Sequence, residues 1–106
     1  ASDTGLIQLS KTKFGHTFSR HGSESTNYLT QRAKGSGQPQ GQFLDDQGAA
    51  RFIQNNLNRA DNGPVSLPVP KGLDVRIINP DGSYTIPRTI RIVPRSNGVK
   101  TAYPEP

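Results

Sequence analysis

The sequence predicts an α+β fold, in which N-terminal helices pack on a C-terminal antiparallel sheet of about four strands. Two observations carry this prediction. Apolar residues recur at helical spacing through roughly the first 60 positions, and after Gly63 their period changes from about four to two. The second half also contains hairpin-type turns between its apolar blocks. Helices followed by consecutive short strands are typical of the α+β class.

The 106 residues are enough for one domain, expected to span 1–106 with residues 1–12 as a flexible lead-in or a short strand around Leu6 to Leu9. Without cysteine the chain has no disulfide and no thiolate metal site. No apolar run reaches the length of a membrane span, and no signal peptide is recognisable. Because the chain begins at Ala1 instead of methionine, we expect it to be part of a longer protein.

The first helix is predicted over residues 14–21. Phe14, Phe18 and His21 fall at i, i+4 and i+7 and therefore share one face. Gly22 follows as a left-handed C-terminal cap. A second helix is predicted over residues 25–34, with Ser23 or Ser25 as its N-cap. Three of its residues are expected to face inward: Tyr28, Leu29 and Ala33.

Residues 35–41 are rich in glycine and are predicted to form a loop. Asp45 or Asp46 can then cap a third helix, which Asp61 and the following Asn-Gly end. Its apolar positions recur at steps of four, four and three: Ala49, Ile53, Leu57 and Ala60.

The remaining chain is predicted to form antiparallel strands over 65–69, 73–78, 83–93 and 99–103. Pro68 and Pro70 limit the first of these strands and indicate an edge position, and Pro87 interrupts the third. The sequence Asn-Pro-Asp-Gly at 79–82 and Ser-Asn-Gly at 96–98 are typical of tight turns.

The chain carries a net charge of +5 and has an isoelectric point of about 10.0. Many small proteins are basic, but here no acidic residue lies between Asp81 and Glu105, a stretch that contains Arg88, Arg91, Arg95 and Lys100. A local field of one sign suits a nucleic-acid backbone. Four cations are expected to bind substrate: Arg20, Arg91, Arg95 and Lys100.

Both histidines of the chain, His16 and His21, lie close together in the sequence and beside Lys11, Lys13 and Arg20. Imidazole exchanges protons near neutral pH without a large pKa shift, so a histidine among cations suits the cleavage of a polyanion. His21 is the candidate general base or acid. It could equally be a half-buried histidine at a helix end. His16 is expected to be structural or a second proton carrier.

The last strand offers a hydroxyl and a phenol. In a regular strand Thr101 and Tyr103 project from one face beside Val99, with Lys100 on the other. Both can donate to a phosphate, and a tyrosine can stack on a base, although threonine and tyrosine are also ordinary strand residues. Arg32 could neutralise a pentavalent phosphorane or be a solvated cation at a helix end.

A metal centre is not expected. Histidines five positions apart do not share a helical face, and the paired aspartates at 45 and 46 are explained by helix capping. No nucleotide-binding glycine loop or serine elbow is present either, so no cofactor is expected.

Four motifs together resemble the C-terminal nuclease domains of bacterial polymorphic toxins, as used in contact-dependent growth inhibition. They are Gly-His-Thr-Phe-Ser-Arg-His at 15–21, Leu-x-x-Arg at 29–32, Ala-Ala at 49–50 and Lys-Thr-Ala-Tyr-Pro at 100–104. The spacing of His21, Arg32 and Thr-x-Tyr is similar to the RNase A-like toxin group. The order of elements is more similar to the barnase/EndoU/colicin/RelE fold.

The resemblance implies a metal-independent ribonuclease toxin that cuts RNA, with tRNA as the expected target, to a 2′,3′-cyclic phosphate. His21 would be the general base, Arg32 a phosphate-binding cation, and Thr101 with Tyr103 a phosphate-orienting pair. It further implies a cognate immunity protein, expected to be acidic because the toxin is basic. Such a domain would be secreted or delivered from the cell surface within a larger effector and would act in the target-cell cytoplasm.

Two other classes of function remain open from the sequence. A nucleic-acid-binding module without catalysis would account for the charge and for Tyr103, but gives the two histidines no role. In a structural or scaffold domain, every one of these features would serve only packing or solubility.

Overall fold

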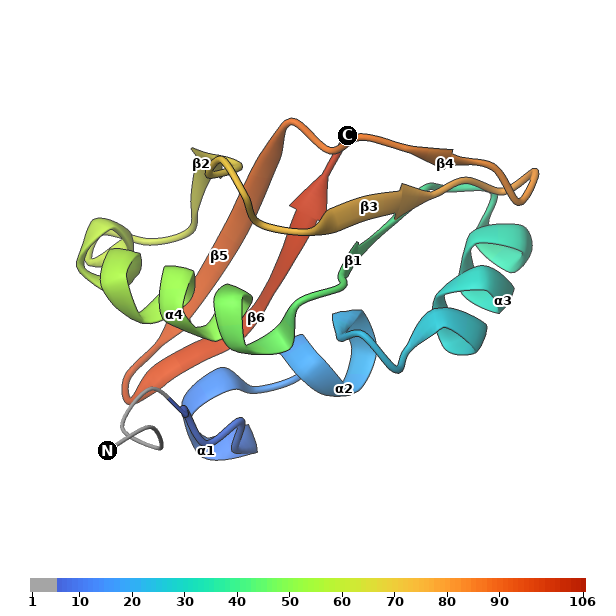
Figure 1. The fold of residues 1–106 in the computed structure, drawn as a ribbon. Helices are drawn as coiled ribbons and strands as arrows, with labels where there is room; N and C mark the ends of the chain where they lie inside the picture. Colours follow the sequence, from blue (N-terminus) through green and yellow to red (C-terminus); the bar gives the residue numbers. More distant parts are fainter. Residues whose placement is uncertain (1–5) are drawn as a thin grey trace.

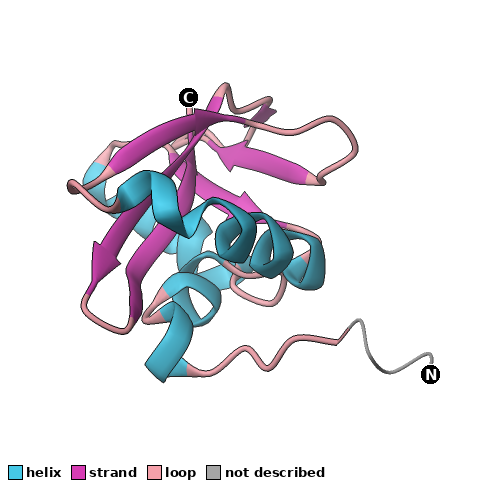
Figure 2. Cartoon of the chain, turned by 90° about the vertical axis from the view of Figure 1, so that its left-hand side faces the viewer, coloured by secondary structure: helices cyan, strands magenta, loops and turns pink. Residues whose placement is uncertain are grey.

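Helices lie mainly in the N-terminal part of the chain and strands in the C-terminal part, which confirms the predicted α+β class (Figure 1). The computed structural model describes residues 6–106. A second view shows most of the strands above the helices (Figure 2). In the described part of the chain, no helix has both the length and the apolar character needed to cross a membrane.

The predicted helix over 14–21 is in fact two short helices, α1 (Lys11–Phe14) and α2 (Thr17–His21). The break occurs at Gly15, which has a φ of 57°. A Cβ there would collide with the Lys100 carbonyl, so glycine allows both the positive φ and the close approach. The expected left-handed cap at Gly22 is wrong, because its backbone is extended.

The second predicted helix is α3 (Thr26–Ser36), which buries Leu29 and Ala33 and ends at a left-handed Gly37. Ser25 precedes it, but its hydroxyl donates to the carbonyls of the preceding helix and makes no side-chain cap. The inward orientation predicted for Tyr28 is wrong, since this side chain is 42% exposed.

The loop predicted over 35–41 contains the start of a strand, β1 (Gln40–Phe43), which pairs antiparallel with β3 (Val75–Ile78). The sequence of β1, Gln-Gly-Gln-Phe, does not alternate between apolar and polar residues, and three of its four positions are buried. Pairing with a distant strand therefore decides its conformation, and no local pattern predicts it.

The third predicted helix is confirmed as α4 (Asp46–Asn56), which continues into the 3₁₀ turn η2 (Leu57–Ala60). The Asp45 carboxylate caps it by accepting a hydrogen bond from the Gly48 N–H at 3.0 Å. The expected apolar face is buried at Ala49, Ile53 and Ala60.

The remaining strands do not form one meander. β2 (Val65–Pro68), β5 (Thr89–Arg95) and β6 (Gly98–Glu105) form one sheet in the order β2-β5-β6, with β2 at the expected edge. The other sheet has the order β1-β3-β4, where β4 is Tyr84–Thr85. The strand predicted over 83–93 is therefore divided near Pro87, and its two parts belong to different sheets.

The two sheets meet where β1 runs beside β6 (Figure 1). Gly41 packs so closely on the Pro104 carbonyl that a Cβ would collide with it. The main core lies between the sheets and α4 and includes Phe14, Phe43, Ile53, Ile90, Ile92, Val99 and Ala102. This seam brings the first third of the chain to the end of the last strand.

The segment before α1 forms no strand, so the strand considered around Leu6 to Leu9 is wrong for the described residues. Ile7 instead bonds to the Gln47 side chain, which accepts from its N–H at 2.8 Å and donates to its carbonyl at 2.9 Å. The Gln47 side-chain amide thus satisfies both backbone hydrogen-bonding groups of Ile7. Residues 1–5 of the predicted lead-in lie outside the described range.

Candidate active site

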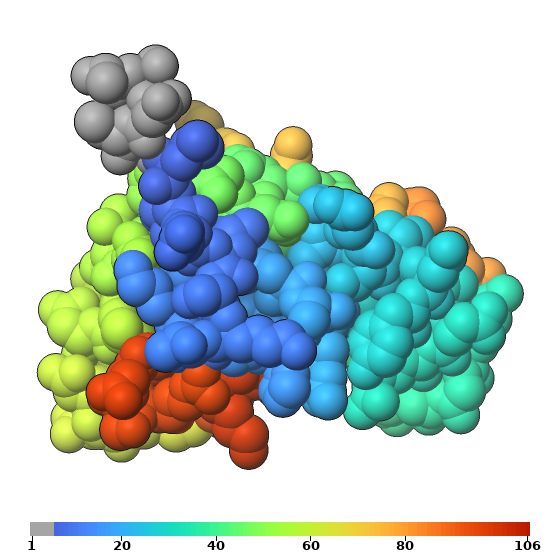
Figure 3. All heavy atoms as spheres, turned by 90° about the horizontal axis from the view of Figure 1, so that it is seen from below, coloured from blue at the N-terminus to red at the C-terminus, as the bar shows by residue number. Residues whose placement is uncertain are grey.

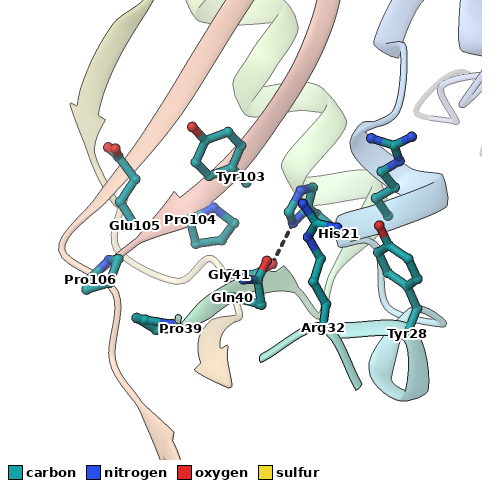
Figure 4. A pocket seen from close by; sticks show the side chains of 11 residues that line it. His21, Tyr28, Arg32, Pro39, Gln40, Gly41, Tyr103, Pro104, Glu105 and Pro106 are labelled. Carbon is teal, nitrogen blue, oxygen red and sulfur yellow. Dashed lines mark hydrogen bonds between the residues drawn. The ribbon is translucent and has the colours of Figure 1, made fainter. Parts of the chain in front are cut away.

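His21 is the last residue of α2 and is held from two directions (Figure 4). Its Nδ1 lies 2.8 Å from the Gly41 carbonyl oxygen of β1. Its ring stacks on Tyr103 of β6, with centroids 5.2 Å apart and planes inclined by 30°. Because a carbonyl only accepts, Nδ1 carries the proton, and Nε2 of the neutral ring is left as the acceptor.

The surroundings of His21 favour its neutral form. Burial lowers the pKa of His21 most, the hydrogen bond to Gly41 raises it, and the nearby charges of Arg20 and Arg32 lower it, with a net shift below the ordinary 6.5. The imidazole is therefore uncharged at neutral pH, with its acceptor nitrogen available. This is the protonation state that a general base requires.

The histidine lines a pocket of about 380 Å³ at the seam between the two sheets. The walls come from four parts of the chain: the end of α2, one face of α3, the start of β1 and the end of β6. The lining residues are Arg20, His21, Tyr28, Arg32, Pro39, Gln40, Gly41, Tyr103, Pro104, Glu105 and Pro106. A volume of this size suits a small ligand or one nucleotide of a longer chain.

Two arginines give one wall of the pocket a positive charge. Arg32 and Tyr28 are four positions apart on α3 and thus share a face, and Arg20 comes from α2. Figure 4 shows Arg32 and Tyr28 on the same side of the pocket as His21. An anion bound there would lie between guanidinium groups and the imidazole, which is a suitable arrangement for a phosphodiester.

Four of the residues singled out from the sequence meet in this pocket: Arg20, His21, Arg32 and Tyr103. His16 does not line it. His16 precedes α2 with an exposed side chain, and its backbone N–H donates to the Lys100 carbonyl at 3.0 Å. The two histidines are therefore near in sequence but differ in environment.

Thr101 shares a face of β6 with Tyr103 but lies outside the pocket lining. The prediction that Val99 shares this face is wrong, because Val99 is fully buried together with Ala102. The register explains this: Thr101 pairs with Val93 and Val99 with Pro94, so Lys100 is the extra residue of a β-bulge.

The other two predicted substrate-binding arginines are also outside the pocket. Arg91 pairs with Tyr103 across the sheet and donates from Nη1 to the Ser66 hydroxyl at 3.3 Å. Arg95 donates to the carbonyls of Lys11 and Thr12 and so ties α1 to the β5–β6 hairpin. Figure 3 shows this hairpin turn, in orange-red, against the blue N-terminal helices.

The junction that carries His21 is fixed by two polar side chains from other elements. The fully buried Gln42 donates from Nε2 to the Gly22 carbonyl and to the Thr26 hydroxyl, both at 2.9 Å. Asp46 accepts hydrogen bonds from the backbone N–H and the hydroxyl of Ser23, both at 2.8 Å. The corner between α2 and α3 is thereby attached to β1 and α4.

The contributors to the pocket that sequence reasoning missed include the Gly41 carbonyl, Tyr28 and Glu105. A backbone carbonyl carries no sequence signal, and Gly41 lies in the strand that was predicted as a loop. For Tyr28, its i, i+4 spacing to Arg32 was the available signal. Glu105 lies two positions after Tyr103, so the alternation of strand faces already placed them together.

Among residues 6–106, no group of three or more histidine, cysteine or carboxylate side chains is arranged to hold a metal ion. Comparison of the chain with protein-family profiles, curated protein sequences and solved structures finds no significant match in any of the three. Function is therefore inferred from the chemistry of the pocket and from the motif resemblance described above.

Proposed function

We propose that the chain is a metal-independent endoribonuclease that cleaves RNA by transphosphorylation. The observation that carries this proposal is the fixed imidazole of His21, with Nδ1–H bonded to Gly41 and Nε2 available, in a pocket that also contains Arg32. RNA supplies its own nucleophile, the 2′-hydroxyl. The enzyme therefore has to supply a base, positive charge at the phosphorane and a proton for the leaving oxygen.

In the proposed reaction, Nε2 of His21 takes the proton of the 2′-hydroxyl. The 2′-oxygen forms a bond to phosphorus, and the bond from phosphorus to the 5′-oxygen breaks, which leaves a 2′,3′-cyclic phosphate. Arg32 and Arg20 neutralise the charge that develops on the non-bridging oxygens. The phenol of Tyr103, stacked beside His21, gives its proton to the departing 5′-oxygen. DNA has no 2′-hydroxyl and should be inert.

The resemblance to polymorphic toxins supports a biological setting for this activity. On that basis we propose a toxin domain of a larger secreted or cell-surface-delivered effector, which cleaves tRNA in the cytoplasm of a target cell. The net charge of +5 supports RNA as the substrate and an acidic immunity protein as the partner. Both partners would be attracted to the same basic molecule.

The test is a gel of purified tRNA and of total RNA after incubation with the protein in EDTA. We expect wild-type protein to give fragments with cyclic phosphate ends and His21→Ala to lose at least about 100-fold in rate. His16→Ala is the matched control and should retain cleavage, because this exposed histidine lies outside the pocket.

Three results would change the proposal. Degradation of all RNA without discrete tRNA fragments would keep the reaction and remove the tRNA preference. RNA that stays intact but shifts in a binding gel would indicate a binding module. RNA that neither breaks nor binds would support a scaffold domain.

A further inference from the structure

One residue of the pocket does not fit a phosphate site. Glu105 provides the only carboxylate side chain among the lining residues, which otherwise include two arginines and the histidine. A carboxylate repels phosphate and would weaken its binding. Its presence therefore indicates a different part of the ligand, one that offers hydrogen-bond donors.

The Glu105 carboxylate is held in place by two neighbouring strands. Its Oε1 accepts hydrogen bonds from the Ser66 hydroxyl of β2 at 2.7 Å and from the Thr89 hydroxyl of β5 at 2.8 Å. These two bonds occupy both lone pairs of Oε1. Oε2 makes no hydrogen bond with the described residues. It is therefore an unused acceptor, and the bonds of Oε1 already fix its orientation.

A guanidinium is linked to the Glu105 carboxylate through one serine. Arg91 donates from Nη1 to the same Ser66 hydroxyl that donates to Glu105, and it lies opposite Tyr103 in the strand register. Its other N–H groups have no hydrogen-bond partner among the described residues. A carboxylate acceptor and guanidinium donors are thus linked through one serine on the face of the sheet that carries Tyr103.

The pocket also offers flat apolar surface beside this pair. Figure 4 shows Glu105 and Tyr103 projecting from β6 in the same direction, and Pro39 and Pro106 also line this end of the pocket. Aromatic and apolar surfaces of this kind stack on nucleobases in single-stranded RNA. The ligand group at this end of the pocket is therefore expected to be planar and to have donors on its edge.

Among the four bases, guanine matches best. Its Watson–Crick edge presents two adjacent donors, N1–H and the N2 amino group, and its O6 and N7 accept from an arginine. In adenine and cytosine an acceptor nitrogen lies beside the amino group, and in uracil two carbonyls flank the single N–H. A carboxylate would be repelled by each of those acceptors.

We infer that Glu105, together with Arg91 on the sheet face outside the pocket lining, forms a base subsite that selects guanine next to the scissile phosphate. This inference rests on the proposed function, since it assigns a base preference to the same pocket. It makes Glu105 a specificity-determining residue and leaves the proton transfers to His21 and Tyr103. It also explains how a basic pocket can retain a carboxylate.

The test measures nucleotide binding separately from cleavage. The 3′-monophosphates of guanosine, adenosine, cytidine and uridine are titrated into wild-type protein, Glu105→Gln and Glu24→Gln by isothermal calorimetry. We expect wild type to bind the guanosine nucleotide roughly 5-fold or more tighter than the other three, as one bidentate contact typically gives. Glu105→Gln should bind all four about equally.

Glu24→Gln is the matched control, because Glu24 is the only other glutamate of the chain, is exposed and lies outside the pocket. It should retain the wild-type preference. Equal binding of the four nucleotides by wild type would overturn the inference, and this result does not depend on any variant folding. A guanine preference that survives in Glu105→Gln would overturn the role of Glu105.

The outcome for the base subsite can be separated from the outcome for the reaction. A guanine preference that depends on Glu105, in a protein that leaves RNA intact in the gel, would support the subsite and refute the ribonuclease. Cleavage of RNA without any guanine preference would do the reverse.

Discussion

Tyr103, which only three residues of the chain follow, stacks on His21, with ring centroids 5.2 Å apart. The contact covers one face of the imidazole while the Gly41 carbonyl binds its edge. Three segments that are distant in sequence therefore determine the orientation, the tautomer and the protonation of one side chain. Each of these properties can be tested separately.

Replacement of Tyr103 separates the stacked ring from its hydroxyl. Tyr103→Phe keeps the ring against His21 but removes the phenolic proton, so RNA cleavage should fall by roughly 10²-fold or more if the phenol is the general acid. The pKa of His21, measured by NMR titration, should stay lowered in this variant. Tyr103→Ala exposes the imidazole and should move that pKa back toward 6.5. An unchanged rate in Tyr103→Phe would assign the proton to another donor.

The lowered pKa of His21 predicts a pH dependence of stability. The unfolded chain, in which this histidine has an ordinary pKa near 6.5, binds the proton more readily than the folded chain. The contribution to stability is therefore present above pH 6.5 and is lost as the pH falls through the lower folded value. Urea unfolding between pH 8 and pH 5 should show this loss in wild type.

His21→Gln and His16→Gln make a matched pair for that measurement. His21→Gln should flatten the dependence in the acidic range, because the group responsible is gone. His16→Gln should follow the wild-type curve. The opposite assignment, with the pH dependence removed by His16→Gln, would contradict the structural environments described here.

Two glycine-to-alanine substitutions should act in opposite directions. Gly15→Ala places a Cβ against the Lys100 carbonyl at a φ of 57° and should destabilise the protein by more than about 1 kcal/mol. Gly35 lies within α3 and has open space where a Cβ would be. Gly35→Ala should therefore stabilise the fold by about 0.5–1 kcal/mol. Urea midpoints would show both effects. If the two substitutions changed the stability equally, the close approach of Gly15 to the Lys100 carbonyl at the break between α1 and α2 would be contradicted.

Gln42 should matter for stability because its amide is fully buried and bonded on both sides. It donates to the Gly22 carbonyl, and its Oε1 accepts from Nε of Arg76 at 2.9 Å. Gln42→Leu removes the amide and leaves these partners without their hydrogen bonds, which should lower the free energy of unfolding by about 1–3 kcal/mol. Gln38→Leu, at an exposed position after α3, is the control and should change stability little. A neutral Gln42→Leu would show that the corner carrying His21 is held by other contacts.

Local sequence was sufficient for the features that depend on neighbouring residues. The helical spacing from Ala49 to Ala60 and a capping carboxylate at Asp45 or Asp46 predict α4 correctly, and Asp45 is the cap. The turn at 79–82 also forms as predicted, with the Gly82 N–H donating to the Asn79 carbonyl at 2.9 Å and a φ of 87° at the glycine. His21, Arg32 and Tyr103 were identified because their residue types suit the chemistry.

The sequence by itself thus determined the α+β order, the capped start of α4 and the candidate residues. Only the tertiary structure decided which of them meet. β1 exists because β3 pairs with it, the bulge at Lys100 sends Val99 into the core, and Gly41 sets the tautomer of His21. The physical reason is that strand pairing and backbone contacts join residues far apart in the chain, and such contacts leave no periodic signal in the sequence around them.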